Sequence, residues 1–280
     1  MIVSFHPLFE ADKNIICAGR EPNAKDLSSI MAADAVILPQ GCRRSLYEIA
    51  RNHCDFVFPN YEARFRYPGK IGQIELFRKT KTGHPMSAIF NTVAAFHQKY
   101  DEITQKLPFS LPFVFKFNWG GEGDTVYLIQ SMVDLHDLLV KAAAYEKSGQ
   151  RGFLIQEYIP DQKKTLRVVI IGRRAISYWR VRQETDSFRD NLSRGAVINT
   201  EAEPQRQHLA VAFVKNFCKK TGIDLAGFDV IFSPVPDKTE AMLLEINYFF
   251  GRKGLGGSES YYRILQQEIQ SWLKRIGYQL

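Results

Sequence analysis

The sequence predicts a fold of mixed α/β and α+β class, with a small parallel sheet followed by a larger region of strands and helices. In the first ninety residues, short apolar runs alternate with helical spacing of Leu, Ile and Met, which is the βαβ rhythm of a parallel sheet. In the last third, hairpin-like strand pairs outnumber crossovers, which favours an α+β arrangement. The 280 residues are 45% apolar and 24% charged, an ordinary globular composition with material for a buried core.

The first elements form an expected N-terminal sheet domain over residues 1–88. Apolar runs predict strands at 2–5, 15–18, 35–38 and 56–59. Helical spacing predicts helices at 24–33 and 43–53, and a third helix from Gly69 to about Thr82. This third helix is expected to end at Gly83-His84-Pro85, because proline and glycine stop a helix.

The remaining elements are expected to form two further domains, over 89–160 and 161–280. In the first, we predict helices at 92–106 and 132–147, the latter capped by Ser131 or Asp134, and strands at 113–117, 126–129 and 153–158. In the second, we predict strands at 167–171, 175–182, 227–232 and 241–246, and helices at 204–221 and 259–276.

Charge and cysteine usage restrict the class of partner. The formal net charge is +7, but the basic residues are scattered, so an anionic small substrate such as a nucleotide is favoured over a nucleic acid. Four cysteines at irregular spacing indicate reduced thiols, and the adjacent pair His53-Cys54 is poorly suited to act as a catalytic dyad. No apolar run reaches 18 residues and the first residues do not have the pattern of a secretory signal, so a cytoplasmic protein without a membrane span is expected.

A predicted strand ends in a lysine and leads into a glycine-rich loop. Lys116 is followed by Gly120, Gly121 and Gly123. Glycine lets backbone amides approach phosphate oxygens closely, and the lysine adds a positive charge. The Walker motif and the Rossmann fingerprint are both absent. In isolation, a plain turn explains this stretch better than a phosphate-binding loop.

Carboxylates occur inside two apolar strands near the C-terminus. Asp229 lies in AGFDVIF, and Glu245 lies in MLLEINYFF two residues before Asn247, so that Glu245 and Asn247 share one face. A buried carboxylate needs a cation or hydrogen-bond donors. If the two strands pair as a hairpin, three hard oxygen ligands suit Mg²⁺. The alternative is a polar strand face turned to water.

Arginines in the same region form a third group. Arg167 and Arg180 lie in β-rich segments, and Arg194 lies in the following loop, FRDNLSRGA. The planar guanidinium suits phosphate and acyl-phosphate oxygens, because it can donate two parallel hydrogen bonds. Scattered surface arginines are the alternative, and the other arginines nearby are interpreted that way.

In their order along the chain, these motifs resemble the ATP-grasp superfamily, in particular its glutathione-synthetase-like and RimK-type branch of carboxylate–amine ligases. The resemblance spans roughly Tyr67 to Ser258 and rests on the ordered set of motifs. Gly69-Lys70 resembles the lysine helix, and Lys116 with its loop resembles the flap over the phosphates. The resemblance implies an ATP-grasp fold, in which ATP is clamped between two α+β subdomains behind a small N-terminal parallel-sheet domain.

The resemblance also implies a role for individual residues. The expected ATP contacts are Lys70, Lys116, Gly120, Gly121, Gly123 and the hinge strand residues Gln156, Glu157, Tyr158 and Ile159. The expected ligands of one or two Mg²⁺ ions, or of Mn²⁺, are Asp229, Glu245 and Asn247. The expected catalytic and substrate residues are Arg167, Arg180, Asn191 and Arg194.

The implied reaction is the ADP-forming activation of a carboxylate as an acyl phosphate, followed by attack of an amine. The substrates are then an amino acid, a peptide or a protein tail, and a homodimer is compatible with this interpretation. Arg20 and Glu21, in the first domain, are further candidates for contact with the acceptor. Two alternatives remain, an ATP-grasp kinase of small molecules and a non-catalytic nucleotide-binding module.

Three positions depart from the pattern of the branch. Thr165 stands where the branch has an acid, two residues before the first arginine. Tyr248-Phe249-Phe250-Gly251 replaces the usual small residue, proline and glycine after the metal-ligand asparagine, and a specialised acceptor pocket would explain this change. The flap contains two acidic residues, Glu122 and Asp124.

Overall fold

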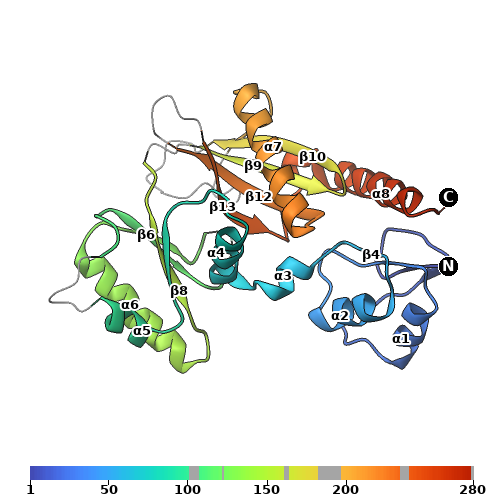
Figure 1. The fold of residues 1–280 in the computed structure, drawn as a ribbon, viewed down its shortest axis with the longest axis horizontal. Coiled ribbons are helices and arrows are strands. Elements are labelled where there is room, and N and C mark those ends of the chain that lie inside the picture. Colours follow the sequence, from blue (N-terminus) through green and yellow to red (C-terminus); the bar gives the residue numbers. More distant parts are fainter. Residues whose placement is uncertain (101–106, 122, 161–163, 182–196, 234–239, 279–280) are drawn as a thin grey trace.

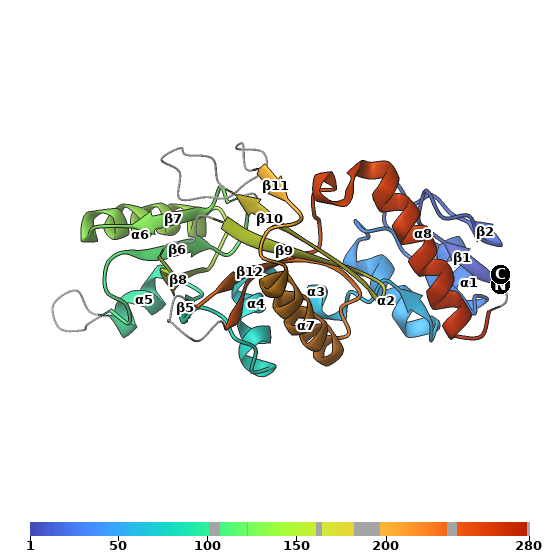
Figure 2. The ribbon, with the colours of Figure 1, turned by 90° about the horizontal axis from the view of Figure 1, so that it is seen from above.

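The computed structural model describes residues 1–100, 107–121, 123–160, 164–181, 197–233 and 240–278, and the elements are named as in Figure 1. Within these residues, the strands form three sheets that follow one another along an elongated molecule (Figures 1 and 2). The N-terminal sheet lies at one end, a sheet formed by β5 to β8 lies at the other, and the C-terminal sheet lies between them.

The N-terminal sheet is parallel, as the alternation of strands and helices predicts. It comprises β1 (Ile2–Ser4), β2 (Lys13–Asn14), β3 (Ala35–Ile37) and β4 (Val57–Phe58) in the order β2-β1-β3-β4, with helices α1 (Ala24–Met31) and α2 (Arg44–His53). The predicted strand at 15–18 is wrong, because pairing with β1 ends at Asn14 apart from one further bond, from Ile15 N to Ser4 O. The chain then turns through positive φ angles at Ala18 and Gly19.

The second sheet is antiparallel, and phenylalanine side chains make up much of the core that packs on it. It comprises β5 (Ser87–Phe90), β6 (Phe113–Phe117), β7 (Val126–Ile129) and β8 (Phe153–Glu157) in the order β5-β8-β6-β7, with α5 (Val93–Lys99) and α6 (Met132–Lys147) packed against it. The rings of Phe115 and Phe153 stack with their centroids 4.8 Å apart. Strand β5 was not predicted, and helix α5 ends at Lys99 rather than continuing toward residue 106.

The C-terminal sheet is antiparallel, in agreement with the predicted hairpins. It comprises β9 (Lys164–Ile171), β10 (Arg174–Val181), β11 (Val197–Asn199), β12 (Leu225–Phe232) and β13 (Ala241–Asn247) in the order β11-β10-β9-β12-β13. Helix α7 (Pro204–Thr221) covers one face, and the 3₁₀ turn η2 (Lys253–Leu255) leads into helix α8 (Gly257–Arg275) on the other.

Alternation along β9 determines which face of this sheet carries the charged groups. Leu166, Val168 and Ile170 pack in the cluster under α7, whereas Val169 and Ile171 pack in the cluster under α8. Successive side chains of a strand point to opposite faces, so Arg167 belongs to the row on the α8 side. Helix α8 also packs against the N-terminal sheet. The face of the C-terminal sheet that carries Arg167 is therefore the face that α8 covers with apolar side chains.

Two helices connect the N-terminal sheet to the rest. They are α3 (Glu62–Arg66), which was not predicted, and α4 (Gly69–Lys79), which contacts β5, β8 and β13. The expected boundary between residues 88 and 89 falls inside β5, and the division into three domains remains a proposal. No helix of the described residues is long and apolar enough to cross a membrane.

Candidate active site

Three strands of the C-terminal sheet bring charged side chains together. Asp229 on β12 lies opposite Arg167 on β9 and opposite Glu245 on β13. Residues opposite each other in antiparallel strands point to the same face, with their Cβ atoms about 5 Å apart. Asn247, at the end of β13, donates from Nδ2 to Asp229 Oδ2 over 3.2 Å. The sheet thus places the three predicted metal ligands beside one of the predicted arginines.

Both carboxylate oxygens of Asp229 accept from arginine. Arg167 Nε and Arg180 Nη2 lie 2.6 and 2.7 Å from Oδ1, and Arg167 Nη2 lies 3.3 Å from Oδ2. All three side chains are buried. Burial by itself would raise the pKa of Asp229, but the two guanidinium groups outweigh it and hold that pKa below its ordinary value. Two cations against one anion leave an excess positive charge for a ligand.

Thr165 supports Arg180 at the position where the branch has an acid. Its Oγ1 accepts from Arg180 Nε over 3.2 Å and from Nη2 over 2.9 Å. A hydroxyl orients the guanidinium without neutralising it. Space for Arg167 comes from Gly227, because a Cβ atom there would lie 3.1 Å from Arg167 Nη1. Both arginines are therefore held in place by their neighbours.

Two buried lysines face this group from other elements. Lys70 lies on α4 and Lys116 on β6, and each is only 8% exposed. Burial lowers the pKa of Lys70, and it lowers the pKa of Lys116 to about 8, while the charge of Glu245 acts in the opposite direction on both. Within the described residues, the ammonium group of Lys116 has no hydrogen-bond partner. A buried cation of this kind favours an anionic ligand.

Lys70 holds the glycine-rich loop. Its Nζ donates to the carbonyl oxygen of Gly120 over 2.9 Å and to that of Trp119 over 3.3 Å. The loop needs glycine because φ is +85° at Gly120 and +76° at Gly123, in the left-handed region. Gly121 has open space around its Cα. The predicted lysine and the predicted loop are therefore in direct contact.

Asn118 joins the loop to the start of helix α4. Its carbonyl oxygen accepts from Lys70 N over 3.2 Å, and its Oδ1 accepts from Ile71 N over 2.9 Å. These amides belong to the first turn of α4, where backbone donors lack partners within the helix. Gly69 permits the approach, since a Cβ atom there would lie 2.4 Å from Asn118 Oδ1. Movement of the loop is thus coupled to the helix that carries Lys70.

The predicted hinge strand forms the opposite wall. Gln156 is buried and donates to Ser87 Oγ over 2.9 Å, and the backbone of Glu157 donates to Met86 O over 2.8 Å. Tyr158 and Ile159 follow the strand and are half-buried. The enclosed space is about 10 Å³, room for roughly one water, so a nucleotide must displace side chains here. It is lined by Lys70, Gln73, Ile74, Lys116, Leu154, Gln156, Leu244 and Glu245.

Gln73 is a positioning residue that the sequence reasoning missed. Its Nε2 donates to Ile246 O over 2.9 Å, and its Oε1 accepts from Ile246 N over 2.8 Å. Ile246 lies between Glu245 and Asn247, so Gln73 aligns helix α4 with the strand that carries two metal-ligand candidates. A signal was present in the sequence, because Gln73 follows Lys70 by three residues and shares its helix face.

The oxygen ligands suit Mg²⁺ chemically. Within the described chain, Glu245 has no hydrogen bond or ion pair, and Asn247 Oδ1 is left as an acceptor because its Nδ2 contacts Asp229. Two carboxylates and an amide are hard ligands of the type that Mg²⁺ prefers. In the described ranges, no group of three or more His, Cys, Asp or Glu residues is arranged to hold a metal ion, so these oxygens would need water or phosphate to complete a coordination sphere.

Some predicted residues cannot be placed. Asn191 and Arg194, with the substrate loop around them, and Glu122 of the flap lie outside the described residues. Their roles remain predictions.

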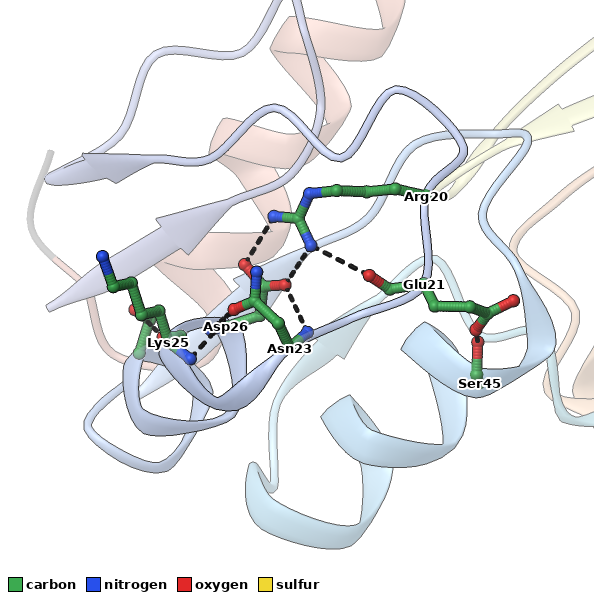
Figure 3. Close-up of polar contacts among 7 residues, drawn as sticks. Arg20, Glu21, Asn23, Lys25, Asp26 and Ser45 are labelled. Atoms are coloured by element: carbon green, nitrogen blue, oxygen red, sulfur yellow. Dashed lines mark hydrogen bonds and ion pairs between the residues drawn. The ribbon is translucent and has the colours of Figure 1, made fainter.

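Arg20 and Glu21 are engaged within the N-terminal domain, as Figure 3 shows. Arg20 forms a two-pronged ion pair with Asp26, at 2.5 and 2.9 Å, and Asp26 also closes the capping box of α1 with Asn23. Glu21 accepts from Ser45 and Arg43 at the start of α2. These contacts stabilise the loop between β2 and α1, and they occupy the charges that were considered for acceptor binding.

The four cysteines are free thiols. Burial raises the pKa of Cys54, and it raises the pKa of Cys42 and Cys218 to about 12. Only the thiolate is a strong nucleophile. The high pKa of Cys54 therefore gives no support to a catalytic dyad of His53 and Cys54.

Comparison with known proteins identifies the family and the fold of the chain. Residues 69–270 match the RimK-like ATP-grasp domain family. A sequence search of curated proteins gives no significant match. Among solved structures, the fold is similar to a RimK domain ATP-grasp protein from Sphaerobacter thermophilus, with a TM-score of 0.58, 13% identity, and coverage of 95% of this chain and 98% of that one.

Two ligase structures share the fold over part of their length. An L-amino acid ligase from Bacillus licheniformis has a TM-score of 0.59 and 15% identity, covering 94% of this chain and 63% of that one. The N5-carboxyaminoimidazole ribonucleotide synthetase purK, solved with ADP, has a TM-score of 0.57 and 12% identity, covering 85% and 59%. This chain spans less than two thirds of either ligase. Because the family match extends over most of the sequence, the chain belongs to the RimK-like ATP-grasp domain family.

Proposed function

We propose that the protein is an ADP-forming ligase that activates a carboxylate with Mg-ATP and joins it to an amine. The observation that carries this proposal is the convergence of two buried lysines and two buried arginines on Asp229 and Glu245. Phosphoryl transfer depends mainly on positioning and charge neutralisation, which these groups supply. The fold shared with an L-amino acid ligase supports this reaction class.

Each group has a separate task in this proposal. Lys70 and Lys116 hold the phosphates of ATP, and the glycine loop donates backbone amides to them. Mg²⁺, held by Glu245, Asn247 and Asp229, would neutralise charge on the triphosphate. Arg167 and Arg180 stabilise the negative charge that develops during transfer, using the positive charge that Asp229 leaves uncompensated.

The reaction has two steps. A carboxylate oxygen of the donor attacks the γ-phosphorus, the bond from that phosphorus to the bridging oxygen breaks, and ADP leaves. The amine nitrogen then attacks the acyl carbon, the bond from that carbon to the phosphate oxygen breaks, and the nitrogen releases a proton. Asn191 and Arg194 are proposed to hold the donor carboxylate, as the family resemblance implies.

Replacement of Glu245 tests the proposal. We expect Glu245→Gln to lower carboxylate-dependent ADP formation by more than about tenfold, because a charged oxygen is lost from the metal and phosphate site. The measurement is phosphate and ADP release over a panel of amino acids and dipeptides. Glu259→Gln is the control, since Glu259 is exposed and pairs with Arg263 on the surface of α8. Activity of Glu245→Gln within tenfold of the parent would refute the assignment.

Hydroxylamine distinguishes the ligase from the alternatives. An acyl phosphate reacts with hydroxylamine to give a hydroxamate, so we expect a hydroxamate when donor, ATP and hydroxylamine are combined. A stable phosphorylated product without hydroxamate would instead identify a small-molecule kinase. Nucleotide binding without any turnover on the panel would favour a non-catalytic module.

A further inference from the structure

A second cavity, of about 530 Å³, lies next to the candidate active site. Its volume falls within the range of about 300–1,000 Å³ that is common for small-molecule sites. It is lined by Gln40, Phe249, Phe250, Gly251, Arg252, Lys253, Gly257 and Ser258. The lining segment begins two residues after Asn247, and Phe250 packs against Gly227 beside Arg167. A molecule in this cavity would therefore be adjacent to the phosphate site.

Arg252 provides a fixed positive charge in this cavity. Its guanidinium carbon lies 4.8 Å from the ring centroid of Tyr261 and 4.5 Å from that of Tyr262, and Nη1 lies 3.4 Å from Ser258 Oγ. In the part of the chain that the structure describes, Arg252 has no carboxylate partner. A guanidinium held in one orientation, with its charge uncompensated, is suited to bind a carboxylate through two hydrogen bonds.

Phe249 provides a largely exposed apolar wall of this cavity. It is 61% exposed, yet the guanidinium carbon of Arg64 lies 4.8 Å from its ring centroid. Arg64 is itself held by the rings of Tyr61 and Phe65, at 5.0 and 4.8 Å. An exposed but fixed phenyl ring gains hydrophobic free energy when a ligand covers it, at little cost in side-chain entropy.

Gln40 holds the lining segment in place from the N-terminal domain. Its Nε2 donates to Tyr248 O over 2.9 Å, and its Oε1 accepts from Tyr261 Oη over 3.3 Å. The same residue's backbone oxygen accepts from Tyr61 Oη over 3.0 Å. The segment that carries Phe249 and Arg252 is thereby held against the N-terminal domain, and both residues line the one cavity.

We propose that this cavity binds the amine acceptor and selects a free α-amino acid with a large apolar side chain, such as phenylalanine. Arg252 binds the α-carboxylate and Phe249 contacts the side chain. The amino group is then directed toward Asn247 and the acyl phosphate. This inference rests on the ligase function proposed above, and it accounts for the aromatic residues that replace the family's usual small residue and proline.

Direct binding to the full-length chain tests the assignment without turnover. The probes are L-phenylalanine, L-alanine, L-glutamate and 2-phenylethylamine, titrated calorimetrically. We expect L-phenylalanine to bind about tenfold more tightly than L-alanine, because its ring covers Phe249, and more tightly than L-glutamate. Equal or tighter binding of L-glutamate would overturn the proposal, because the second cation, Lys253, would then dominate.

Two variants separate the two contacts. Phe249→Ala is expected to remove the preference for L-phenylalanine over L-alanine, whereas Phe249→Leu retains part of it. Arg252→Gln is expected to weaken the binding of both amino acids about tenfold or more and to leave the affinity for 2-phenylethylamine unchanged. Arg263→Gln, on the exposed face of α8, is the matched control. An unchanged preference in Phe249→Ala, or unchanged amino-acid binding in Arg252→Gln, would overturn the assignment.

Parallel titration with Mg-ATP distinguishes the two proposals. If Mg-ATP binds and L-phenylalanine does not, the acceptor assignment is wrong and the ligase proposal stands. If L-phenylalanine binds and Mg-ATP does not, the ligase proposal fails, and the cavity is an amino-acid site with another purpose.

Discussion

Lys116 is a residue of the site whose pKa lies within about one unit of neutral pH. Its ammonium group is buried, and burial lowers its pKa to about 8. A lysine with a lowered pKa is charged below that value and becomes neutral as the pH rises through it. Nucleotide binding that uses this charge must therefore weaken on the alkaline side.

The affinity for ATP is expected to fall about tenfold between pH 7 and pH 9, because roughly nine tenths of Lys116 is neutral one unit above its pKa. Lys116→Met should bind ATP weakly at both values, with a smaller dependence on pH. The measurement is a fluorescence titration with an ATP analogue. Lys141→Met, on the exposed face of α6, is the control. A constant affinity of the parent protein across this range would contradict the role of Lys116.

Asp229 and Glu245 lie opposite each other but are expected to differ in their effect on stability. Asp229 forms ion pairs with two buried arginines, and the removal of one partner from a buried ion pair costs about 3–5 kcal/mol. Glu245 has no such partner in the described chain. In urea unfolding, the free energy of unfolding should therefore fall by several kcal/mol for Asp229→Asn. For Glu245→Gln it should fall by about 1 kcal/mol or less. Equal losses would mean that Glu245 also has a structural role.

At the scale of elements, helix α4 and strand β13 act as one unit. Gln73 makes two hydrogen bonds to Ile246, and Lys70 lies one turn earlier on the same helix. Gln73→Met keeps the approximate volume but leaves the backbone N–H and C=O of Ile246 without these partners. Each unsatisfied group costs about 1–3 kcal/mol when buried.

Gln73→Met is accordingly expected to lower both the unfolding free energy and the affinity for ATP. Thermal unfolding and the fluorescence titration measure the two effects. Gln266→Met is the matched control, because Gln266 donates an exposed hydrogen bond to Leu8 O. A loss of stability with unchanged affinity would show that the alignment of α4 does not matter for the nucleotide.

The sequence predicted those elements whose signals are local. Helices α6 and α7 begin and end as predicted, because Ser131 caps the first and Pro204 begins the second. Strands β5 and β11 were missed, because each is short and is stabilised by pairing with residues far away in the sequence. Local pattern carries no information about such pairing.

The sequence allowed us to predict which residues belong to the candidate site, but not which of them contact each other. Asp229 and Glu245 were recognised because carboxylates inside apolar strands require a cation or hydrogen-bond donors. The pairing of Asp229 with Arg180 depends on the order β10-β9-β12, which brings together strands separated by helix α7 in the sequence. Support of Arg180 by Thr165 was not foreseen for a different reason: the predicted strand at 167–171 begins after Thr165, whereas β9 begins at Lys164 and pairs Thr165 with Arg180.

At the scale of the whole molecule, the functional groups come from all three sheets. Lys116 lies on β6 of the sheet of β5 to β8, and the arginines and carboxylates lie on β9, β10, β12 and β13 of the C-terminal sheet. Gln40, which follows β3 of the N-terminal sheet, positions the segment after Asn247. Helix α8 packs between the N-terminal and C-terminal sheets. The arrangement of the sheets therefore determines whether the proposed acceptor cavity exists.

The contacts of β13 also bear on how copies of the protein behave in solution. This strand is the last of its sheet, a place where an unpaired backbone ladder invites a strand from another molecule. Here Gln73 occupies both backbone groups of Ile246, and Leu243 N donates to Gly83 O over 2.8 Å. The side chain that aligns the active site thus also protects this margin of the sheet against intermolecular strand addition and aggregation.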